Sequence, residues 1–182
     1  MTKRDTVVDL LLRQHQEINR LLTKVEKSTG KPRAEAFDRL RHLLAVHETA
    51  EEEIVHPYAR RTISNGARVT ESIVKEENQA KHTLQELERL GTDSVEFTPL
   101  FMRFQKAVLA HAEHEERQEF PELAAKSSPE QLKGMVAAVK AAEAIAPTHP
   151  HPGVESPAMN LALGPMAAVV DRTRDAIRKA MG

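Results

Sequence analysis

Cysteine and tryptophan are absent from this chain of 182 residues, and aromatic side chains make up only 3% of it. Without cysteine the protein forms neither disulfides nor thiolate metal sites, and the cytoplasm is its expected location. With so few aromatic residues, the core has to be built from Leu, Val, Ile, Ala and five Phe. Such a composition favours packed helices over a β-sandwich.

A dominant charge and long hydrophobic runs are also missing. The formal net charge is −1, with 26 basic and 27 acidic residues, so no general attraction to nucleic acid is expected. No apolar stretch reaches the roughly 18 residues that a membrane span needs. Charged side chains recur every few positions in residues 1–30, unlike a secretory signal. The sequence therefore predicts neither a membrane nor a nucleic acid as partner.

Apolar residues at helical spacing dominate what is present. Pro57 is expected to kink or tighten the end of the second predicted helix, and Pro121 to close the fourth. Long helices joined by short loops favour an all-α, antiparallel up-down four-helix bundle over residues 1–124. The four helices are predicted at about 6–28, 33–60, 68–90 and 97–120.

The composition changes after residue 124. A fifth, Ala-rich helix is predicted to begin near Pro129, and a final amphipathic helix follows a Pro-rich connector at 147–157. We expect residues 125–182 to form a helical extension that docks on the bundle or on a partner chain. The sequence leaves open whether the protein is a monomer or a homodimer.

Two stretches place a histidine four residues before a glutamate and end in a proline. They are "HETAE", from His47 to Glu51, and "HAEHE", from His111 to Glu115. Residues four apart share one face of a helix. The spacing alone decides little, because acidic residues are frequent and His82 with Glu86 repeats it on a polar face.

The position of these residues within the apolar stripes is more informative. Six ionisable side chains interrupt the apolar stripes. In an up-down bundle their positions along the bundle axis would differ by no more than about one or two helical turns. Burying three carboxylates without partners is very costly, and a multivalent cation offsets that cost. The six predicted metal ligands are His15, His47, Glu51, Glu77, His111 and Glu115.

Imidazole and carboxylate ligands without thiolate suit non-haem iron, manganese or zinc. Two HxxxE pairs can supply two bridging carboxylates, which favours a dinuclear site. Redox chemistry would need iron or manganese, whereas zinc would leave a structural or hydrolytic site. Glu48, next to His47, and Tyr58, the single tyrosine, are additional candidate ligands.

The sequence resembles the hemerythrin family, in its bacterial HHE cation-binding branch. The resemblance rests on the order of His15, the first HxxxE pair with its proline, a ligand in the third helix and the second HxxxE pair with its proline. The resemblance covers about residues 5–122. It implies a non-haem centre of two iron ions, bridged by the two carboxylates and by an oxo or hydroxo group. It also implies reactions with O2, peroxide (H2O2) or NO, or a role in iron sensing or storage.

One position departs from the family's pattern, which usually has a histidine in the third helix. Here the segment is "KEENQAKH", in which Glu77 takes that position and His82 is the alternative. A carboxylate makes the site harder and more anionic and should favour ferric iron. This argues against reversible O2 transport and for peroxide breakdown or redox sensing.

The sequence thus favours a protein that reacts with peroxide or O2, in catalase-like peroxide handling or an oxidative-stress response. The alternatives are a non-enzymatic sensor of iron, O2, NO or redox state, an iron-binding module, and a helical interaction protein without metal. Whether it is an enzyme stays open. We expect His42, His56 and His114 at the surface or behind the ligands, and the Glu-rich run 113–122 to be a solvated face beside the ligands.

Overall fold

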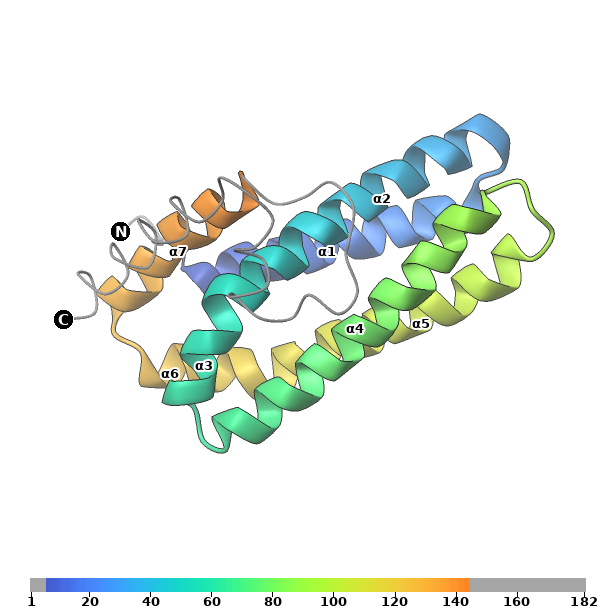
Figure 1. Cartoon of the computed structure of the whole chain (residues 1–182). Coiled ribbons are helices and arrows are strands. Elements are labelled where there is room, and N and C mark those ends of the chain that lie inside the picture. Colours follow the sequence, from blue (N-terminus) through green and yellow to red (C-terminus); the bar gives the residue numbers. More distant parts are fainter. Residues whose placement is uncertain (1–5, 145–182) are drawn as a thin grey trace, which may run out of the picture.

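The computed structural model describes residues 6–144, which form helices joined by short loops and contain no strand. The long helices pack against one another as an antiparallel bundle (Figure 1). The predicted all-α bundle is therefore confirmed, with helix ends shifted by a few residues. The long helices are α1 (Val7–Lys27), α2 (Gly30–Ala50), α4 (Gly66–Leu90) and α5 (Phe97–His114).

Local signals explain where the helices begin and end. Thr6 and Asp9 form a capping box at the start of α1, in which each side chain accepts a hydrogen bond from the other residue's backbone N–H. Gly91, with a φ of 75°, ends α4 in a conformation that glycine adopts without strain. These signals lie in the sequence itself, which is why the helix ends could be predicted.

Two of the long helices pass through a π turn before they end. α2 continues through η1 (Glu51–Val55) into α3 (His56–Thr62), and α5 continues through η2 (Glu115–Glu119) into α6 (Phe120–Lys126). In each turn a backbone N–H bonds to the carbonyl five residues earlier, from His56 to Glu51 and from Phe120 to Glu115. Such turns concentrate at functional sites.

The prediction that Pro121 closes the fourth helix is wrong, because the helical path continues to Lys126. Pro57 likewise lies at the start of α3 and not in a tightened last turn. Each proline is among the first residues after a π turn, where a missing backbone N–H is tolerated.

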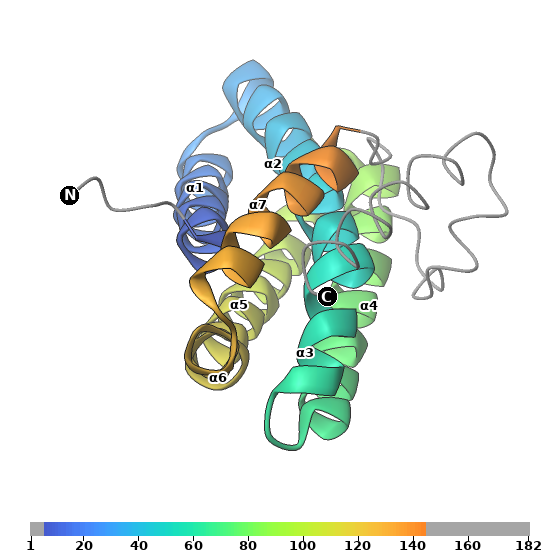
Figure 2. The ribbon, with the colours of Figure 1, turned by 90° about the vertical axis from the view of Figure 1, so that its left-hand side faces the viewer.

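The fifth helix, α7 (Pro129–Glu143), begins where it was predicted and lies across α1 and α2 (Figure 2). Its apolar residues, such as Met135 and Val139, join a buried cluster with Val7, Leu11 and Val55. A second apolar cluster fills the far end of the bundle, between α1, α2, α4 and α5. The connector at 147–157 and the final predicted helix lie outside the described residues. None of the described helices has the length and apolarity to cross a membrane.

Candidate metal centre

A group of buried polar side chains separates the two apolar clusters. In α1, for example, His15 lies between Leu11 of one cluster and Ile18 of the other. The carboxylates of Glu51, Glu77 and Glu115 are completely buried. Groups of this kind are rare in a protein interior unless they are paired or bind a cation.

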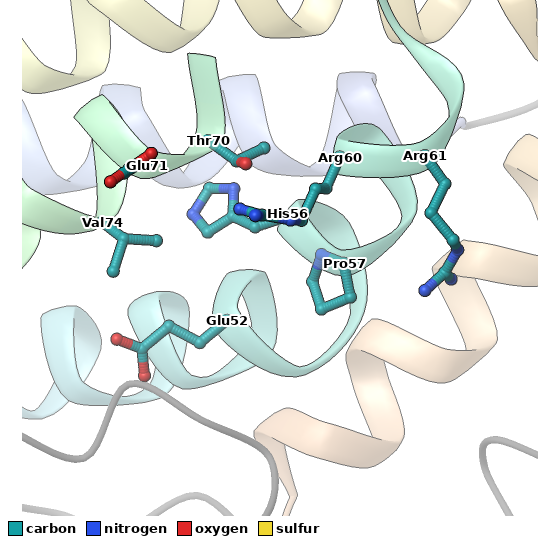
Figure 3. A pocket seen from close by; sticks show the side chains of 8 residues that line it. All are labelled: Glu52, His56, Pro57, Arg60, Arg61, Thr70, Glu71 and Val74. Atoms are coloured by element: carbon teal, nitrogen blue, oxygen red, sulfur yellow. The ribbon is translucent and has the colours of Figure 1, made fainter. Parts of the chain in front are cut away.

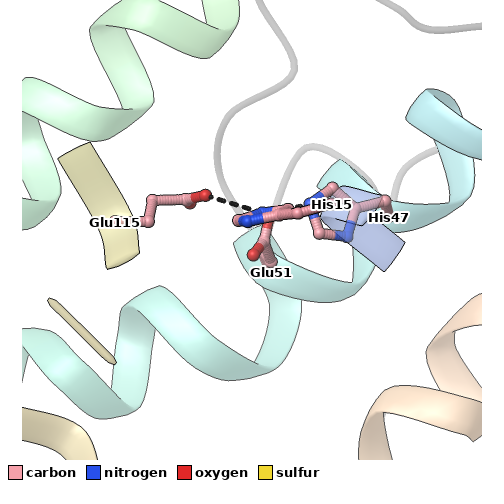
Figure 4. A group of neighbouring side chains, drawn as sticks. All are labelled: His15, His47, Glu51 and Glu115. Carbon is pink, nitrogen blue, oxygen red and sulfur yellow. Dashed lines mark ion pairs between the residues drawn. The ribbon is translucent and has the colours of Figure 1, made fainter. Parts of the chain in front are cut away.

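The structure brings the six predicted ligands into two overlapping groups. His15, His47, Glu51 and Glu115 form the first, with one donor atom of each within 4.8 Å of the others, and they face one another in Figure 4. In the second group, Glu77 and His111 join the same Glu51 and Glu115 within the same limit. Two groups of four donors that share two carboxylates can hold two metal ions with both carboxylates between them.

Three histidines are oriented in the same way toward the centre. Each places its ring Nδ1 on an oxygen outside the cluster and leaves Nε2 directed at the buried carboxylates. This is the usual arrangement of metal-binding histidines, because the outer bond fixes the tautomer and orients the ring. The pairs on Nδ1 are His15–Glu116 at 2.8 Å, His47–Gln14 at 2.9 Å and His111–Glu76 at 3.4 Å.

Several inner atoms of the cluster lack a hydrogen bond within the described part of the chain. They include Nε2 of His15 and of His111 and both carboxylate oxygens of Glu51 and of Glu115. Although His15 Nε2 lies 3.2 Å from Glu115 Oε2, this contact is not aligned as a hydrogen bond. Unsatisfied buried groups cost free energy. The unpartnered atoms are nitrogen and carboxylate oxygen, so they fit iron, manganese or zinc.

Without metal, the environment shifts the pKa values of these groups strongly. Burial, followed by the nearby charge of Glu115, raises the pKa of Glu51 well above its usual value. Burial, helped by His15, lowers the pKa of His47 well below its usual value. Burial also acts to lower the pKa of His111, but carboxylates, Glu115 first, outweigh it and raise that pKa to about 9. Metal binding at such groups would displace protons.

His56 and Glu119 also belong to the cluster, whereas the sequence argument placed His56 at the surface or behind the ligands and did not single out Glu119. His56 is 4% exposed and Glu119 is completely buried. His56 Nδ1 lies 3.0 Å from Glu119 Oε1, and its Nε2 lies 2.9 Å from Glu77 Oε1. His56 thus lies behind the ligand Glu77, one of the two positions expected for it, and not at the surface. Its two carboxylate partners could not be predicted from spacing, because the π turn changes the direction of every side chain after Glu51.

Glu119 had a usable signal, since it follows Glu115 by four residues as Glu115 follows His111. That spacing places all three on one helix face. The expectation of a solvated face beside the ligands is therefore wrong at Glu119, while Glu113 and Glu116 are exposed and Glu115 is buried as a predicted ligand.

The three additional candidate ligands, Glu48, Tyr58 and His82, lie outside the two groups of four donors. Glu48 is buried, with Oε2 3.8 Å from Nζ of Lys81, which donates a hydrogen bond to Glu52. Burial, partly opposed by Lys81, raises the pKa of Glu48 to about 8. Tyr58 packs in the apolar cluster beneath α7, and His82 is exposed on α4.

Comparisons with known proteins agree with this architecture. The family model of the hemerythrin HHE cation-binding domain matches residues 6–123. A crystal structure of a hemerythrin HHE cation-binding domain-containing protein from Mycobacterium kansasii superposes with a TM-score of 0.67. It covers 93% of this chain and 99% of that one at 20% identity, so it shows the likeness of fold.

A curated relative from Nostoc sp., named a DNA nickase, is 25% identical over 138 residues. The aligned region covers 75% of this chain but only 39% of the Nostoc protein. The chain therefore spans about two fifths of the length of this relative.

Proposed function

We propose, from the premise that this chain belongs to the hemerythrin HHE cation-binding family, that it binds two iron ions and reacts with peroxide or O2. One observation carries this proposal: two groups of four buried donors share the carboxylates of Glu51 and Glu115. The pair of four-donor groups matches a dinuclear centre better than a single ion. Manganese or zinc are the substitutes that the same donors would accept.

Each residue has a definite role in this proposal. His15 and His47 would hold one ion and Glu77 and His111 the other, and Glu51 and Glu115 belong to both groups of donors. A bound pair of iron ions supplies the electron exchange that peroxide chemistry requires. The chain contributes fixed ligands that are shielded from bulk water, since the ligand residues are at most 8% exposed.

Glu77 favours peroxide breakdown over reversible O2 transport. Its carboxylate gives the second ion three carboxylates and one imidazole, an anionic set that should stabilise the ferric state. Catalase-like turnover, in which two H2O2 give two H2O and one O2, needs no further reductant. We do not extend DNA nicking to this chain, because it covers 39% of the Nostoc protein and its formal net charge is −1.

The decisive experiment measures metal content, absorption spectrum and peroxide turnover on protein produced in iron-rich medium. We expect about two iron ions per chain and absorption bands of a bridged iron pair. Turnover that rises with iron content supports an enzyme. Two bound ions without turnover would instead favour the alternative, a non-enzymatic sensor of O2, NO or redox state.

Variants separate ligands from surface acids. Glu51→Ala and Glu115→Ala should each abolish stable binding of both ions, since each residue belongs to both groups. Glu113→Ala is the matched control, because Glu113 is an exposed acid of α5 that pairs with Arg117 at 2.5 Å. Full metal content in all three variants would refute the proposed centre.

A further inference from the structure

A pocket of about 460 Å³ lies beside the centre, between η1, α3 and the first half of α4. Eight residues line it, including Glu52, Thr70 and Val74, and Figure 3 shows His56 among them. At roughly 30 Å³ for a water molecule, the pocket has room for many molecules of the size of H2O2. It is far larger than a packing defect.

His56 connects this pocket to the centre. Among the described residues it alone both lines the pocket and belongs to a group of potential metal donors. On its inner side, Nε2 lies 2.9 Å from Glu77 Oε1 and 3.9 Å from Oε1 of the shared carboxylate Glu115. One imidazole ring therefore separates the pocket from the carboxylates of the centre.

The corresponding position in the other half of the bundle is closed. His56 follows Glu51 by five residues, and Phe120 follows Glu115 by five, each at the end of a π turn. Phe120 is 2% exposed, and its ring stacks on that of His15 with 5.5 Å between centroids. Phe120 also belongs to the apolar cluster that α7 completes. The two halves thus differ at this position. One half has the polar ring of His56 beside a pocket, and the other has the apolar ring of Phe120 inside the core.

The fold holds the pocket open at a fixed place. At Gly66 the backbone of α4 touches α3 so closely that an added Cβ would lie 2.5 Å from the carbonyl oxygen of Ala59. Thr70 and Val74 follow Gly66 at intervals of four residues and line the pocket beyond this contact. The Thr70 hydroxyl donates a hydrogen bond to the Gly66 carbonyl at 2.8 Å, so the polar group of Thr70 has a partner within its own helix.

The charges around the pocket disfavour free cations. Arg60 and Arg61 line it and are exposed, whereas Glu52 on the inner wall accepts a hydrogen bond from the buried Lys81. Glu71 is the remaining acid in the lining. Two arginines outweigh one uncompensated carboxylate, so neutral molecules and small anions are preferred over metal ions.

We propose that this pocket is the route by which peroxide-sized neutral or anionic molecules reach the metal centre, and that His56 is the positioning residue at its inner end. The inference rests on the proposed function, because it requires a loaded centre. In this role the ring of His56 holds Glu77 and Glu119 in place and moves aside to admit a small molecule. The bulk of the side chain at residue 74 then sets how fast that molecule passes.

Stopped-flow mixing of the iron-loaded full chain with azide, followed by absorbance, tests the route. Val74→Trp fills the pocket without touching the centre, and Val74→Phe fills it less. We expect azide to bind and leave about tenfold more slowly in Val74→Trp, with an intermediate effect in Val74→Phe. Because a narrowed route slows both directions equally, the dissociation constant should stay unchanged. Gln79→Trp, on the exposed face of the same helix, is the control and should behave as the wild type.

The outcomes separate this inference from the proposed function. Two bound ions with equal azide rates in all variants would overturn the route alone, whereas a chain that binds no metal would overturn both. A changed dissociation constant would mean that Val74→Trp distorts the centre, which also counts against the route. Slower release of iron to a chelator with unchanged azide rates would make the pocket a path for metal ions and overturn the proposal.

Discussion

The outer hydrogen bonds of the histidines make the two halves of the centre chemically different. His47 and His111 hold equivalent positions, but the neutral Gln14 accepts from one ring and the carboxylate of Glu76 from the other. A carboxylate partner makes the imidazole a stronger donor to a metal ion. Burial acts to lower the pKa of His111, but the charge of Glu115 and then the hydrogen bond with Glu76 outweigh it and raise that pKa to about 9, whereas burial and His15 lower the pKa of His47. Because His15 in the first half also pairs with a carboxylate, that of Glu116, the clearer difference is Glu77, whose carboxylate makes its half the more anionic one.

At the residue scale, Glu77→Ala tests the assignment in α4. Removing this carboxylate takes one donor from the second group, so the iron content should fall from about two ions per chain to about one. Metal analysis and the loss of the bridged-pair absorption would report the change. His82→Ala is the control, because His82 is exposed and should leave both ions bound. A loss of iron in His82→Ala alone would contradict the assignment.

At the scale of elements, the two π turns determine which side chains enter the centre. In an α-helix each residue advances by about 100°, so a residue five positions later points well away from its starting face. The π turn takes in one more residue and turns His56 back toward Glu77. The same geometry places Phe120 over His15 in the other half. Both inner contacts thus depend on backbone bonds that a regular helix would not make.

Replacing Pro57 tests the π turn at Glu51–Val55. Pro57→Ala restores a backbone N–H, which allows a regular α-helix across this stretch and rotates His56 away from Glu77. We expect metal affinity to fall about tenfold, as is typical when an outer partner of a ligand is lost. Calorimetric titration of metal-free protein with ferrous or zinc ions would measure it. Pro32→Ala, in the exposed first turn of α2, should change nothing.

Gly66→Ala tests the backbone contact between α3 and α4. Its Cβ would meet two backbone oxygens, of Ala59 at 2.5 Å and of Arg60 at 2.6 Å, and backbone atoms cannot move aside as a side chain does. The free energy of unfolding should drop by about 1–3 kcal/mol, the usual cost of overpacking. Chemical denaturation would show this, and Ser72→Ala on the exposed face of α4 should stay near the wild type. Unchanged stability of Gly66→Ala would mean that the helices separate easily.

At the scale of the whole molecule, the centre lies between two apolar clusters and takes part in folding. Metal-free protein must keep several buried carboxylates close together, which is unfavourable. Ions that bind only the folded chain stabilise it by mass action. We therefore expect the metal-loaded protein to unfold at a higher temperature than the metal-free protein.

The stability of the metal-free protein should fall as the pH rises from about 6.5 to about 9. Folded His111 has a pKa of about 9 against an ordinary value of 6.5, so its stabilising contribution is complete below 6.5 and is lost toward 9. Glu48, with a folded pKa of about 8, acts in the same direction up to about pH 8, because the folded chain keeps a proton that the unfolded chain has released. Each such proton changes the free energy of unfolding by about 1.4 kcal/mol per pH unit.

Urea unfolding of chelator-treated protein across this pH range would measure the effect. Iron-loaded protein should show a weaker dependence, since metal replaces the protons. Stability that rises with pH in the metal-free protein would contradict the assigned pKa shifts.

The apolar period of 3.6 residues determined the bundle, and the helix ends followed from local signals such as Thr6 and Gly91. It also placed His15, Glu77 and the two HxxxE pairs on inward faces, because the side chains of a regular helix have predictable directions. The structure brings all six together.

Only the tertiary structure decided which further polar residues are buried beside these ligands and where the pocket lies. The π turns alter the period after Glu51, so His56 could not be assigned to the cluster from spacing. Lys81 is buried only because Glu48 and Glu52 from another segment pair with it. Likewise, the pocket beside His56 exists because the backbones of α3 and α4 meet at Gly66. Local periodicity fixes which face of a helix is apolar, but contacts between distant segments decide which polar groups are buried together.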